Sequence, residues 1–100
     1  MRGQDLKPLT HREIGEKLKS FPGWKFNDNK IGKQFVFKSF THAVAFVDKL
    51  RPFCNRIDHH PDIHIYYKKI VFELQRFSIG GRVTERDFTV AQEIERLYSR

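Results

Sequence analysis

The chain has 100 residues, 39% of them hydrophobic and ten of them phenylalanine, which suits a single domain with a small aromatic-rich core. Nineteen Lys and Arg residues against twelve Asp and Glu residues give a net charge of +7, which favours anionic partners. The single cysteine excludes an internal disulfide framework, no segment reaches the ~20 apolar residues that span a membrane, and residues 1–10 lack the apolar run of a secretory signal. We therefore expect a soluble protein of a reducing compartment such as the cytoplasm, with the nucleus or an organelle left open.

Residues 1–8 are predicted to form a loose N-terminal arm that precedes a short helix. Thr10 is a favourable N-cap, and Glu13 stands three residues later at the capping-box position. The break at Pro22 and Gly23 is predicted to end the helical segment. The inner face is expected to carry apolar side chains at helical spacing: Ile14, Leu18 and Phe21.

Two strands joined by a turn are predicted next. Trp24 and Phe26 begin an extended stretch, and NDNK at residues 27–30 is typical of a turn, because Asn and Asp tolerate left-handed backbone. Apolar and polar residues then alternate, which predicts a second strand paired with the first as a hairpin. The two expected faces of that strand are Ile31, Phe35 and Phe37 on one side, and Gln34 and Lys38 on the other.

The longest helical pattern runs over residues 39–57, with Ser39 or Thr41 as its N-cap. Pro52 is expected to kink the interior of this helix. Cys54 belongs to the apolar pattern, which indicates a reduced core thiol rather than a nucleophile. The apolar residues that recur at three- and four-residue spacing are Phe40, Ala43, Val44, Val47, Leu50, Cys54 and Ile57.

Two further strands are predicted at residues 63–67 and 70–75, with a tight connection at residues 68–69 and a glycine-marked loop at residues 78–82. In both strands apolar and polar residues alternate. The apolar sets are Ile63, Ile65 and Tyr67 in the first, and Ile70, Phe72 and Leu74 in the second.

A closing helix is predicted after Thr84, which serves as N-cap, with Asp87 at the capping-box position. Its apolar stripe is Phe88, Ala91, Ile94 and Tyr98. The order is thus helix-strand-strand-helix-strand-strand-helix, and short links between paired strands favour antiparallel pairing. The predicted fold is α+β: a four-stranded antiparallel sheet with three helices packed on one face, in a single domain over residues 1–100.

Three histidines lie in RIDHHPDIHIYY, residues 56–67, and three interpretations compete. No metal site is expected, because adjacent histidines seldom reach one ion and no Cys, Asp or Glu stands at a spacing typical of zinc. His59 and His60 stand where a helix gives way to a strand, and Pro61 keeps His60 out of helical geometry. Two imidazoles at such a corner suit acid–base catalysis near neutral pH, but they equally suit polar capping of the helix end.

Three motifs of the sequence occur together: DHHP at residues 58–61, the glycine pair at residues 80–81, and TERDF at residues 84–88. In this combination, with the aromatic Tyr67 after the histidine pair, the chain resembles the pterin-4a-carbinolamine dehydratase family, also known as the dimerisation cofactor of a homeodomain transcription factor. The resemblance extends from about Thr10 to Tyr98. It includes Trp24, FVFKSFTHAVAFV at residues 35–47 and TERDFTVAQEIE at residues 84–95.

The resemblance implies a helix-backed four-stranded sheet, a homodimer or homotetramer, and dehydration of 4a-hydroxytetrahydrobiopterin to the quinonoid dihydropterin in tetrahydrobiopterin recycling. It implies no metal and no organic cofactor. The implied catalytic residues are His59, His60 and Asp87. The implied pterin-binding residues are Asn55, His59, His60, Pro61, Arg76, Phe77, Ser78 and Ile79.

The chain departs from the family pattern at two positions. The family's third histidine belongs to a Thr-His element three residues before the paired glycines, where this chain has Arg76 and Phe77. The family often has an acidic residue four positions before the first histidine of the pair, where this chain has Asn55. One extra residue also stands between Gly81 and TERD. Since Phe77 transfers no proton and Asn55 carries no charge, reduced activity is expected. His64 could act as a substitute donor, but its alternation with Ile63 and Ile65 favours a polar residue on a strand face.

Two other functions were weighed. These departures and the charge of +7 fit a binding or assembly protein on the same scaffold, either a transcriptional dimerisation cofactor or an enzyme assembly factor. General nucleic-acid binding is disfavoured, because the sequence contains no RNP-type aromatic motif, no zinc-finger spacing and no glycine-rich phosphate loop.

Overall fold

The structure, a computed structural model, describes residues 7–76 and 81–100. Within these ranges it has three helices and four strands, in the predicted order. The helices are α1 (His11–Leu18), α2 (Phe40–Ile57) and α3 (Glu85–Tyr98). The strands are β1 (Lys25–Asn27), β2 (Lys30–Val36), β3 (Asp62–Tyr66) and β4 (Lys69–Leu74). The predicted α+β class is confirmed.

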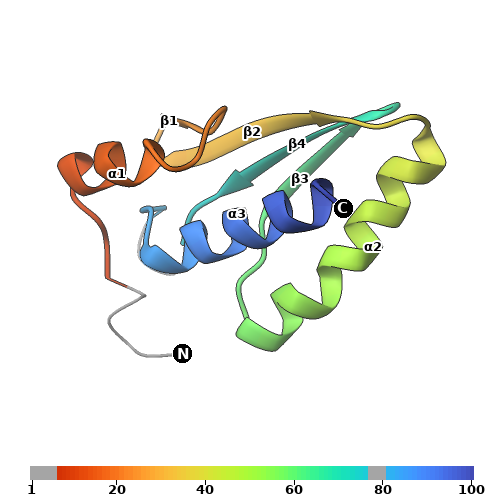
Figure 1. Cartoon of the computed structure of the whole chain (residues 1–100). Helices are drawn as coiled ribbons and strands as arrows, with labels where there is room; N and C mark the ends of the chain where they lie inside the picture. Colours follow the sequence, from red (N-terminus) through yellow and green to blue (C-terminus); the bar gives the residue numbers. More distant parts are fainter. Residues whose placement is uncertain (1–6, 77–80) are drawn as a thin grey trace.

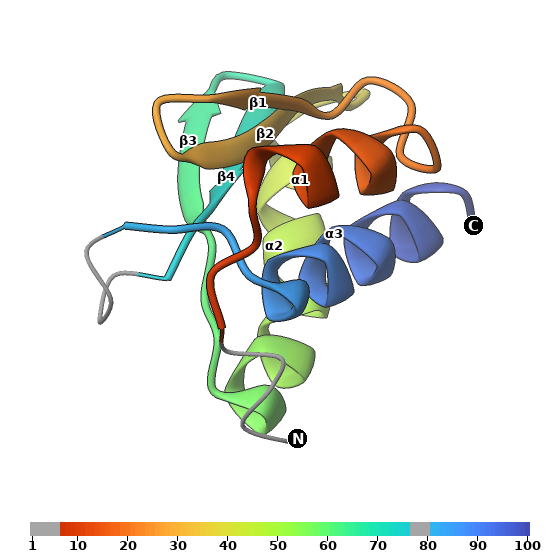
Figure 2. The ribbon, with the colours of Figure 1, turned by 90° about the vertical axis from the view of Figure 1, so that its left-hand side faces the viewer.

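The four strands form one antiparallel sheet in the order β1-β2-β4-β3. In Figure 1 the sheet runs across the top of the molecule with α2 and α3 below it, and Figure 2 shows the helices together on one side of the strands. The β1–β2 turn is made by Asp28 and Asn29, both with positive φ (54° and 62°). Two such residues produce the twist of a two-residue hairpin, which confirms the predicted turn.

The core lies between the sheet and the helices and is rich in aromatic side chains, as the composition indicates. Phe35 of β2 and Phe72 of β4 are at most 2% exposed, and their ring centroids lie 5.8 Å apart with the edge of one ring towards the other. The apolar helical side chains that are at most 2% exposed are Ile14, Ala43, Leu50, Val90, Ala91 and Ile94. Burying a side chain of Leu or Ile size stabilises the fold by roughly 1.5–3 kcal/mol.

The N-terminal half of the chain is attached to α3 and to the residues just before it at several places, two of which position the start and the C-terminal half of the helix. Glu95 of α3 accepts hydrogen bonds from Trp24 Nε1 at 2.8 Å and from Lys33 Nζ at 2.6 Å. Pro8 forms an isolated antiparallel bridge with Thr84, and Leu9 N–H donates to the Val83 carbonyl at 2.8 Å. The start of α3 is therefore held between the N-terminal segment and the rest of the fold.

The prediction that Phe40 and Val44 belong to the buried face of α2 is wrong. Their side chains are 53% and 43% exposed, whereas Ala43, Leu50 and Cys54 are buried. At about 100° per residue, Phe40 and Val44 lie about 60° and 100° to one side of Ala43. The other side carries Phe46 and Phe53 and packs towards α3. Helix α2, which runs unbroken through Pro52, is thus covered on one flank only.

Three smaller predictions need correction. The connection between the last two strands is made by Tyr67 and Lys68, because Tyr66 pairs with Lys69. Tyr67 therefore lies outside β3, with φ of 58° and its side chain 71% exposed. Strand β4 ends at Leu74, one residue earlier than predicted. Tyr98 is 42% exposed at the rim of the core, with its ring against Phe35 and Phe37.

Candidate active site

The end of α2 determines where the histidine pair lies. Asp58 takes the left-handed conformation with φ of 53°, its N–H donates to the Asn55 carbonyl at 3.4 Å, and His59 N–H donates to the Cys54 carbonyl at 3.1 Å. These two bonds are those of a Schellman motif, which ends a helix and reverses the chain direction. His59 is thereby turned back against the helix layer, in the link that carries the chain from α2 to β3 (Figure 1).

His59 is buried and bonded to a buried carboxylate. Its side chain is 7% exposed, and Nε2 forms a short hydrogen bond with Oδ1 of Asp87, which is fully buried. The two residues are 28 positions apart in sequence and come from the end of α2 and the first turn of α3. The structure therefore brings together two of the three side chains predicted to be catalytic.

Asp87 is fixed by the capping arrangement that begins α3. Its Oδ2 accepts from Thr84 N–H at 2.7 Å and from the Thr84 hydroxyl at 3.3 Å. Each carboxylate oxygen thus has its own donors, one oxygen from the helix cap and the other from His59. The sequence predicted Asp87 as a capping residue and, by resemblance, as a catalytic residue. The capping contact is confirmed, and the catalytic role stays a prediction.

Arg86, which the sequence reading missed, holds the same two helix ends together. It is only 8% exposed, and one of its terminal nitrogens donates to the carbonyl of Ile57, the last residue of α2, at 3.3 Å. The available signal was a basic residue in the first turn of a helix, where the helix dipole disfavours positive charge. Such a residue is retained when the end of another helix, with its free carbonyls, lies nearby.

His60 is the exposed partner of the pair. Its Nε2 lies 2.9 Å from Oδ1 of Asn55, one turn back along α2. Asn55 occupies the position where the family often has an acid, so the ring of His60 is oriented by a neutral amide oxygen. The structure thus brings together two of the residues predicted to bind the pterin.

The hydrogen bonds assign the proton positions on both rings. A carboxylate only accepts hydrogen bonds, so Nε2 carries the proton in His59. With the amide oxygen of Asn55 assigned as the atom that faces His60, Nε2 carries the proton in that ring as well. Nδ1 of each ring is then the nitrogen that can take or give a proton. No described residue forms a hydrogen bond with Nδ1 of either histidine. The arrangement provides two adjacent proton-transfer groups with different exposure and different partners.

The other predicted site residues are placed as follows. Pro61 is partly buried between His60 and the start of β3. Arg76 follows β4 and forms an isolated bridge with Arg82, its N–H donating to the Arg82 carbonyl at 2.9 Å. No hydrogen bond between described side chains connects Arg76 to the histidines. Phe77, Ser78 and Ile79, and with them most of the predicted glycine-marked loop, lie outside the described residues.

His64, considered as a substitute donor, is a strand residue on the other face of the sheet. It is paired with Val71, whereas its neighbour Ile63 is paired with the buried Phe72. Its Nε2 lies 3.0 Å from Oε1 of Glu73, and the same oxygen forms an ion pair with Lys30. Partial burial raises the pKa of Glu73, but the hydrogen bonds from His64 and Lys30 outweigh it, so that the pKa lies below its ordinary value. His64 therefore serves a cross-strand polar contact.

Two searches of the described residues gave no positive result. No group of three or more His, Cys, Asp or Glu side chains in the described ranges is arranged to hold a metal ion. Among the same residues, no helix has the length and apolar character needed to cross a membrane.

Comparisons with known proteins agree with the geometry. The family model for pterin 4 alpha carbinolamine dehydratase matches residues 7–97. A protein of Sulfolobus acidocaldarius, named provisionally as a pterin-4-alpha-carbinolamine dehydratase, is 43% identical over 89 residues, which are 89% of this chain and 97% of the relative. A protein of Picosynechococcus with the same provisional name is also 43% identical over 89 residues, covering 89% of this chain and 96% of the relative.

Solved structures with the same fold extend the comparison. A transcriptional coactivator/pterin dehydratase of Brucella melitensis has a TM-score of 0.85 and 29% identity, over 91% of this chain and 98% of that one. A pterin dehydratase-like RuBisCO assembly factor of the alpha-carboxysome has a TM-score of 0.58 and 21% identity, over 74% of this chain and 84% of that one, a likeness of fold alone. With a family model that spans residues 7–97 and relatives at 43% identity, the chain belongs to the pterin 4 alpha carbinolamine dehydratase family.

Proposed function

We propose that the chain is a 4a-hydroxytetrahydropterin dehydratase that acts in tetrahydrobiopterin recycling through histidine acid–base catalysis. The observation that supports this proposal most directly is the buried bond between His59 and Asp87, with His60 adjacent and oriented by Asn55. Both rings present Nδ1 for proton transfer, and the proposed chemistry uses side chains only.

The reaction removes water from the substrate in two coupled steps. The bond between C4a and the hydroxyl oxygen breaks, and a proton delivered to that oxygen makes it leave as water. The proton on the adjacent ring nitrogen is removed, and its electron pair forms the new double bond to C4a. One imidazole in its protonated form can supply the first proton, and the other, neutral, can accept the second. Each such transfer typically accelerates a reaction by about 10²–10⁴.

The substitutions at positions 55 and 77 are the basis for proposing reduced activity. Asn55 orients His60 but cannot offer the pterin ring a charge, and Phe77 cannot supply a third proton-transfer group. With two histidines instead of three, the expected rate is below that of a member with the full set by up to the contribution of one acid or base, about 10²–10⁴.

The test is turnover by purified protein at micromolar concentration, with a 4a-hydroxytetrahydropterin as substrate and the quinonoid product followed by absorbance. We expect a rate above the buffer reaction, lost in His59→Ala and His60→Ala and retained in His64→Ala, which removes an exposed histidine on the other sheet face. A wild-type rate equal to that of buffer would rule out the proposed activity. An unchanged rate in both site variants would rule out the site assignment.

A second candidate is a binding or assembly protein that forms a homodimer or homotetramer and engages another protein. Two features favour it: the exposed apolar side chains of α2, Phe40 and Val44, and the outer edge of β3, where Ile65 and Tyr66 are 38% and 58% exposed. Exposed apolar patches and unpaired strand edges are common protein contact surfaces.

The molar mass in solution, measured by light scattering on the wild type and on Phe40→Ser and Val44→Lys, tests whether the α2 surface holds the assembly together. We expect an oligomer that the α2 variants dissociate while the monomer stays folded. A monomeric wild type would contradict the proposed assembly. A partner that recognises the positive charge should be released as the salt concentration rises, since screening weakens exposed charge contacts.

A further inference from the structure

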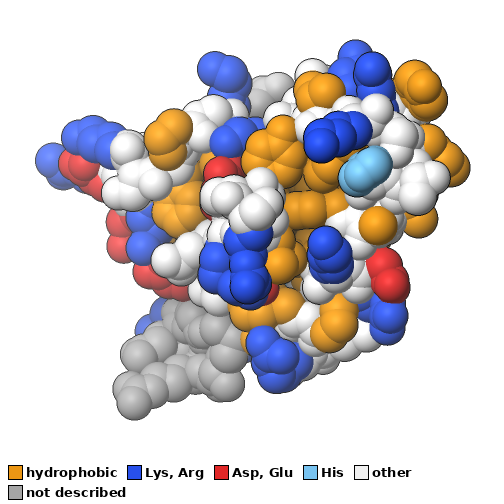
Figure 3. Space-filling view, turned by 45° about the vertical axis from the view of Figure 1, so that its right-hand side comes forward, with side chains coloured by type: hydrophobic (Ala, Val, Ile, Leu, Met, Phe, Trp, Pro, Cys, Tyr) orange, Lys and Arg blue, Asp and Glu red, His pale blue; other side chains and the backbone are white. Residues whose placement is uncertain are grey.

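A groove of about 480 Å³ lies at the end of α2 far from His59. It is bounded by the end of β2, the first half of α2 and the last turn of α3. His42 of the groove and Ile57 at the end of α2 are 15 residues apart, which is roughly 22 Å along a helix. The groove is therefore separate from the candidate active site. Figure 3 shows apolar side chains lining a hollow on this side of the molecule, with Lys and Arg side chains around it and a histidine at its edge.

The floor of the groove is apolar and aromatic, and its side chains are held in place. It consists of Phe37, Phe46, Leu97 and Tyr98. The Tyr98 hydroxyl donates to the Val36 carbonyl at 2.7 Å, which fixes the ring. The ring centroid of Phe37 lies 5.1 Å from that of Phe46 and 5.5 Å from that of Tyr98. Because these rings support each other, a flat ligand would meet a surface that needs little rearrangement.

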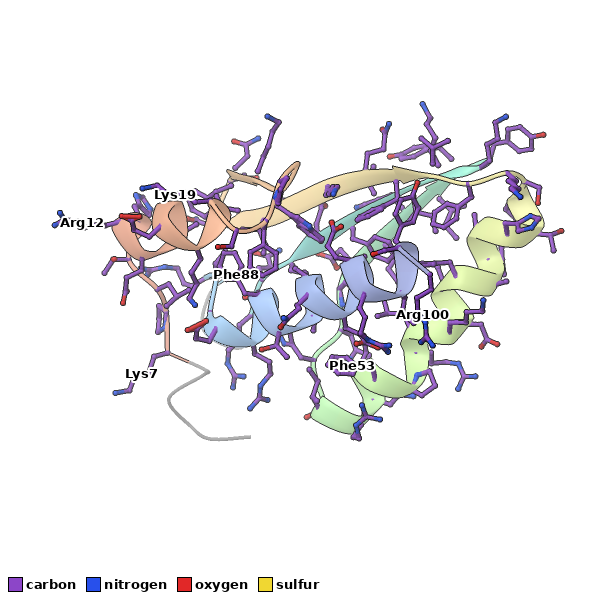
Figure 4. The ribbon with its side chains drawn as sticks, viewed as in Figure 1. Lys7, Arg12, Lys19, Phe53, Phe88 and Arg100 are labelled. Carbon is purple, nitrogen blue, oxygen red and sulfur yellow. The ribbon has the colours of Figure 1, made fainter. Side chains whose placement is uncertain are left out.

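The rim of the groove is cationic. Lys38 lines it from the link between β2 and α2, Lys49 from α2, and Arg100 from the segment after α3, and no Asp or Glu is among its described lining residues. Figure 4 shows Arg100 at the end of α3, on the side that faces α2. His42 is also present, with its Nδ1 2.7 Å from the Ser39 hydroxyl, so that its Nε2 is the ring nitrogen available to the groove.

The lysines of the rim differ from Lys17 and Lys33 in that they form no ion pair with a described residue. Lys33 and Lys17 are paired with Glu95 and Glu85, at 2.6 Å and 2.5 Å. Within the described residues, Lys38 and Lys49 form no such ion pair. The acid next to Lys49 in sequence, Asp48, is engaged by Arg51 at 2.8 Å on the neighbouring face of α2. The positive charge of the rim is thus not compensated by a side chain of the groove.

We propose that this groove is a binding site for a small aromatic anion. The ring would lie on the aromatic floor, and the carboxylate or sulfonate would lie among Lys38, Lys49 and Arg100. The volume of about 480 Å³ falls in the range of roughly 300–1,000 Å³ of small-molecule sites. The apolar floor selects the ring, and the rim cations select the negative charge. Lys38 and Lys49 form no ion pair within the described residues, whereas Arg100 also acts on the carboxylate of Glu93.

Calorimetric titration of the whole chain with 2-naphthalenesulfonate tests the site. We expect saturable binding at one site per chain, weaker as salt is raised, and at least about fivefold weaker for the uncharged 2-naphthol, since rim charges contribute modestly each. The double variant Lys38→Gln, Lys49→Gln should raise Kd at least about fivefold. The matched double variant replaces Lys68 of the β3–β4 turn and Lys69, the first residue of β4, neither of which lines the groove. Lys68→Gln, Lys69→Gln should keep Kd within about twofold.

Several outcomes would overturn the proposal. The first is the absence of saturable binding, and the second is an equal loss of affinity for the probe in both double variants. The third is a loss of affinity in His59→Ala, which would place the probe in the candidate active site. In NMR spectra of the titration, amide shift changes centred on Phe40 and Val44 rather than on Phe37 and Phe46 would place the probe in a second hollow on α2, which Phe40, Val44 and Asp48 line. The dehydration rate is a separate readout, because Lys38 and Lys49 lie away from His59, and the groove can bind the probe whether or not the chain is a dehydratase.

Discussion

Replacement of Asp87 by Asn tests the site most sharply, because the two side chains share a shape but differ in hydrogen-bonding chemistry. Asp87 is fully buried, and its two oxygens accept from His59 on one side and from Thr84 on the other. An amide has one accepting oxygen and one donating nitrogen. His59 and Thr84 both donate to Asp87. In Asp87→Asn, one of these two donors must therefore face the NH₂ group, which is itself a donor.

The two possible orientations of the amide have different costs. If its oxygen remains with His59, the Thr84 N–H loses its acceptor in a buried position, at a cost of about 1–3 kcal/mol. A loss of about 2 kcal/mol lowers the urea midpoint by about 1 M at a slope of about 2 kcal/mol/M. If the oxygen remains with Thr84, Nε2 of His59 must accept, so the ring proton moves to Nδ1. The nitrogen needed as a base is then lost, and the rate falls by about 10²–10⁴.

Urea unfolding and turnover of the same preparation distinguish the two orientations. Asp48→Asn is the matched control, because Asp48 lies on the surface of α2 with its side chain 69% exposed and its ion pair with Arg51 is open to solvent. The control should change stability by no more than about 0.5 kcal/mol and leave the rate unchanged. If Asp87→Asn keeps both the wild-type midpoint and the wild-type rate, the buried bond has neither of the roles assigned to it.

Three further predictions concern the fold. Burial, and secondarily Glu93, raises the pKa of Cys54 from 9.0 to about 11, so at pH 8 iodoacetamide should alkylate the native protein about 100-fold more slowly than the urea-unfolded chain; equal rates would contradict a buried thiol. The hydrogen bond from Arg96, opposed by partial burial, lowers the pKa of Glu93 below 4.5, so the stability that Glu93 adds is present above about pH 4.5 and is lost as the pH falls through its folded-state pKa. Urea unfolding of Glu93→Gln should therefore show a cost of at most about 1 kcal/mol at pH 7 that shrinks below pH 4.5, and a cost independent of pH would refute the linkage. Phe72→Ala, at a fully buried position of β4, should cost about 3–5 kcal/mol in the same assay, and a cost below about 1 kcal/mol would be inconsistent with the described core.

The elements that the sequence predicted well are those specified by local chemistry. Thr10 caps α1 with Glu13 in a capping box, Ser39 caps α2, and the Asp28–Asn29 turn joins β1 to β2, all from residues within a few positions of each other. The alternation in β2 and β4 likewise reported directly which side chains are buried. Such signals need no knowledge of what packs against an element.

The errors came from features that depend on distant parts of the chain. Phe40 and Val44 have apolar spacing, but whether they are buried depends on which flank of α2 the third helix covers. The β3–β4 turn shifted by one residue because the register is set by pairing across the sheet, with Ile65 opposite Ile70. Neither choice is encoded in the local period.

The candidate site shows the same division. Spacing alone left the histidine pair undecided between catalysis and helix capping, and Asp87 entered the site through family resemblance. The contact between His59 and Asp87 spans 28 residues, and Arg86 was missed because its acceptor is the carbonyl of Ile57 on another helix. Contacts between helix ends depend on how the helices dock, and the local spacing of residues does not reveal that arrangement.

The junction between the end of α2 and the start of α3 also has a consequence for folding kinetics. Each helix carries its own capping signals and can begin to form locally, but His59 and Asp87 meet only when the two helix ends dock. Closing this 28-residue separation is slower than forming either helix. During refolding, helical circular dichroism should therefore recover no later than the proposed dehydratase activity, and a lag between the two signals would measure the time taken to dock α2 against α3.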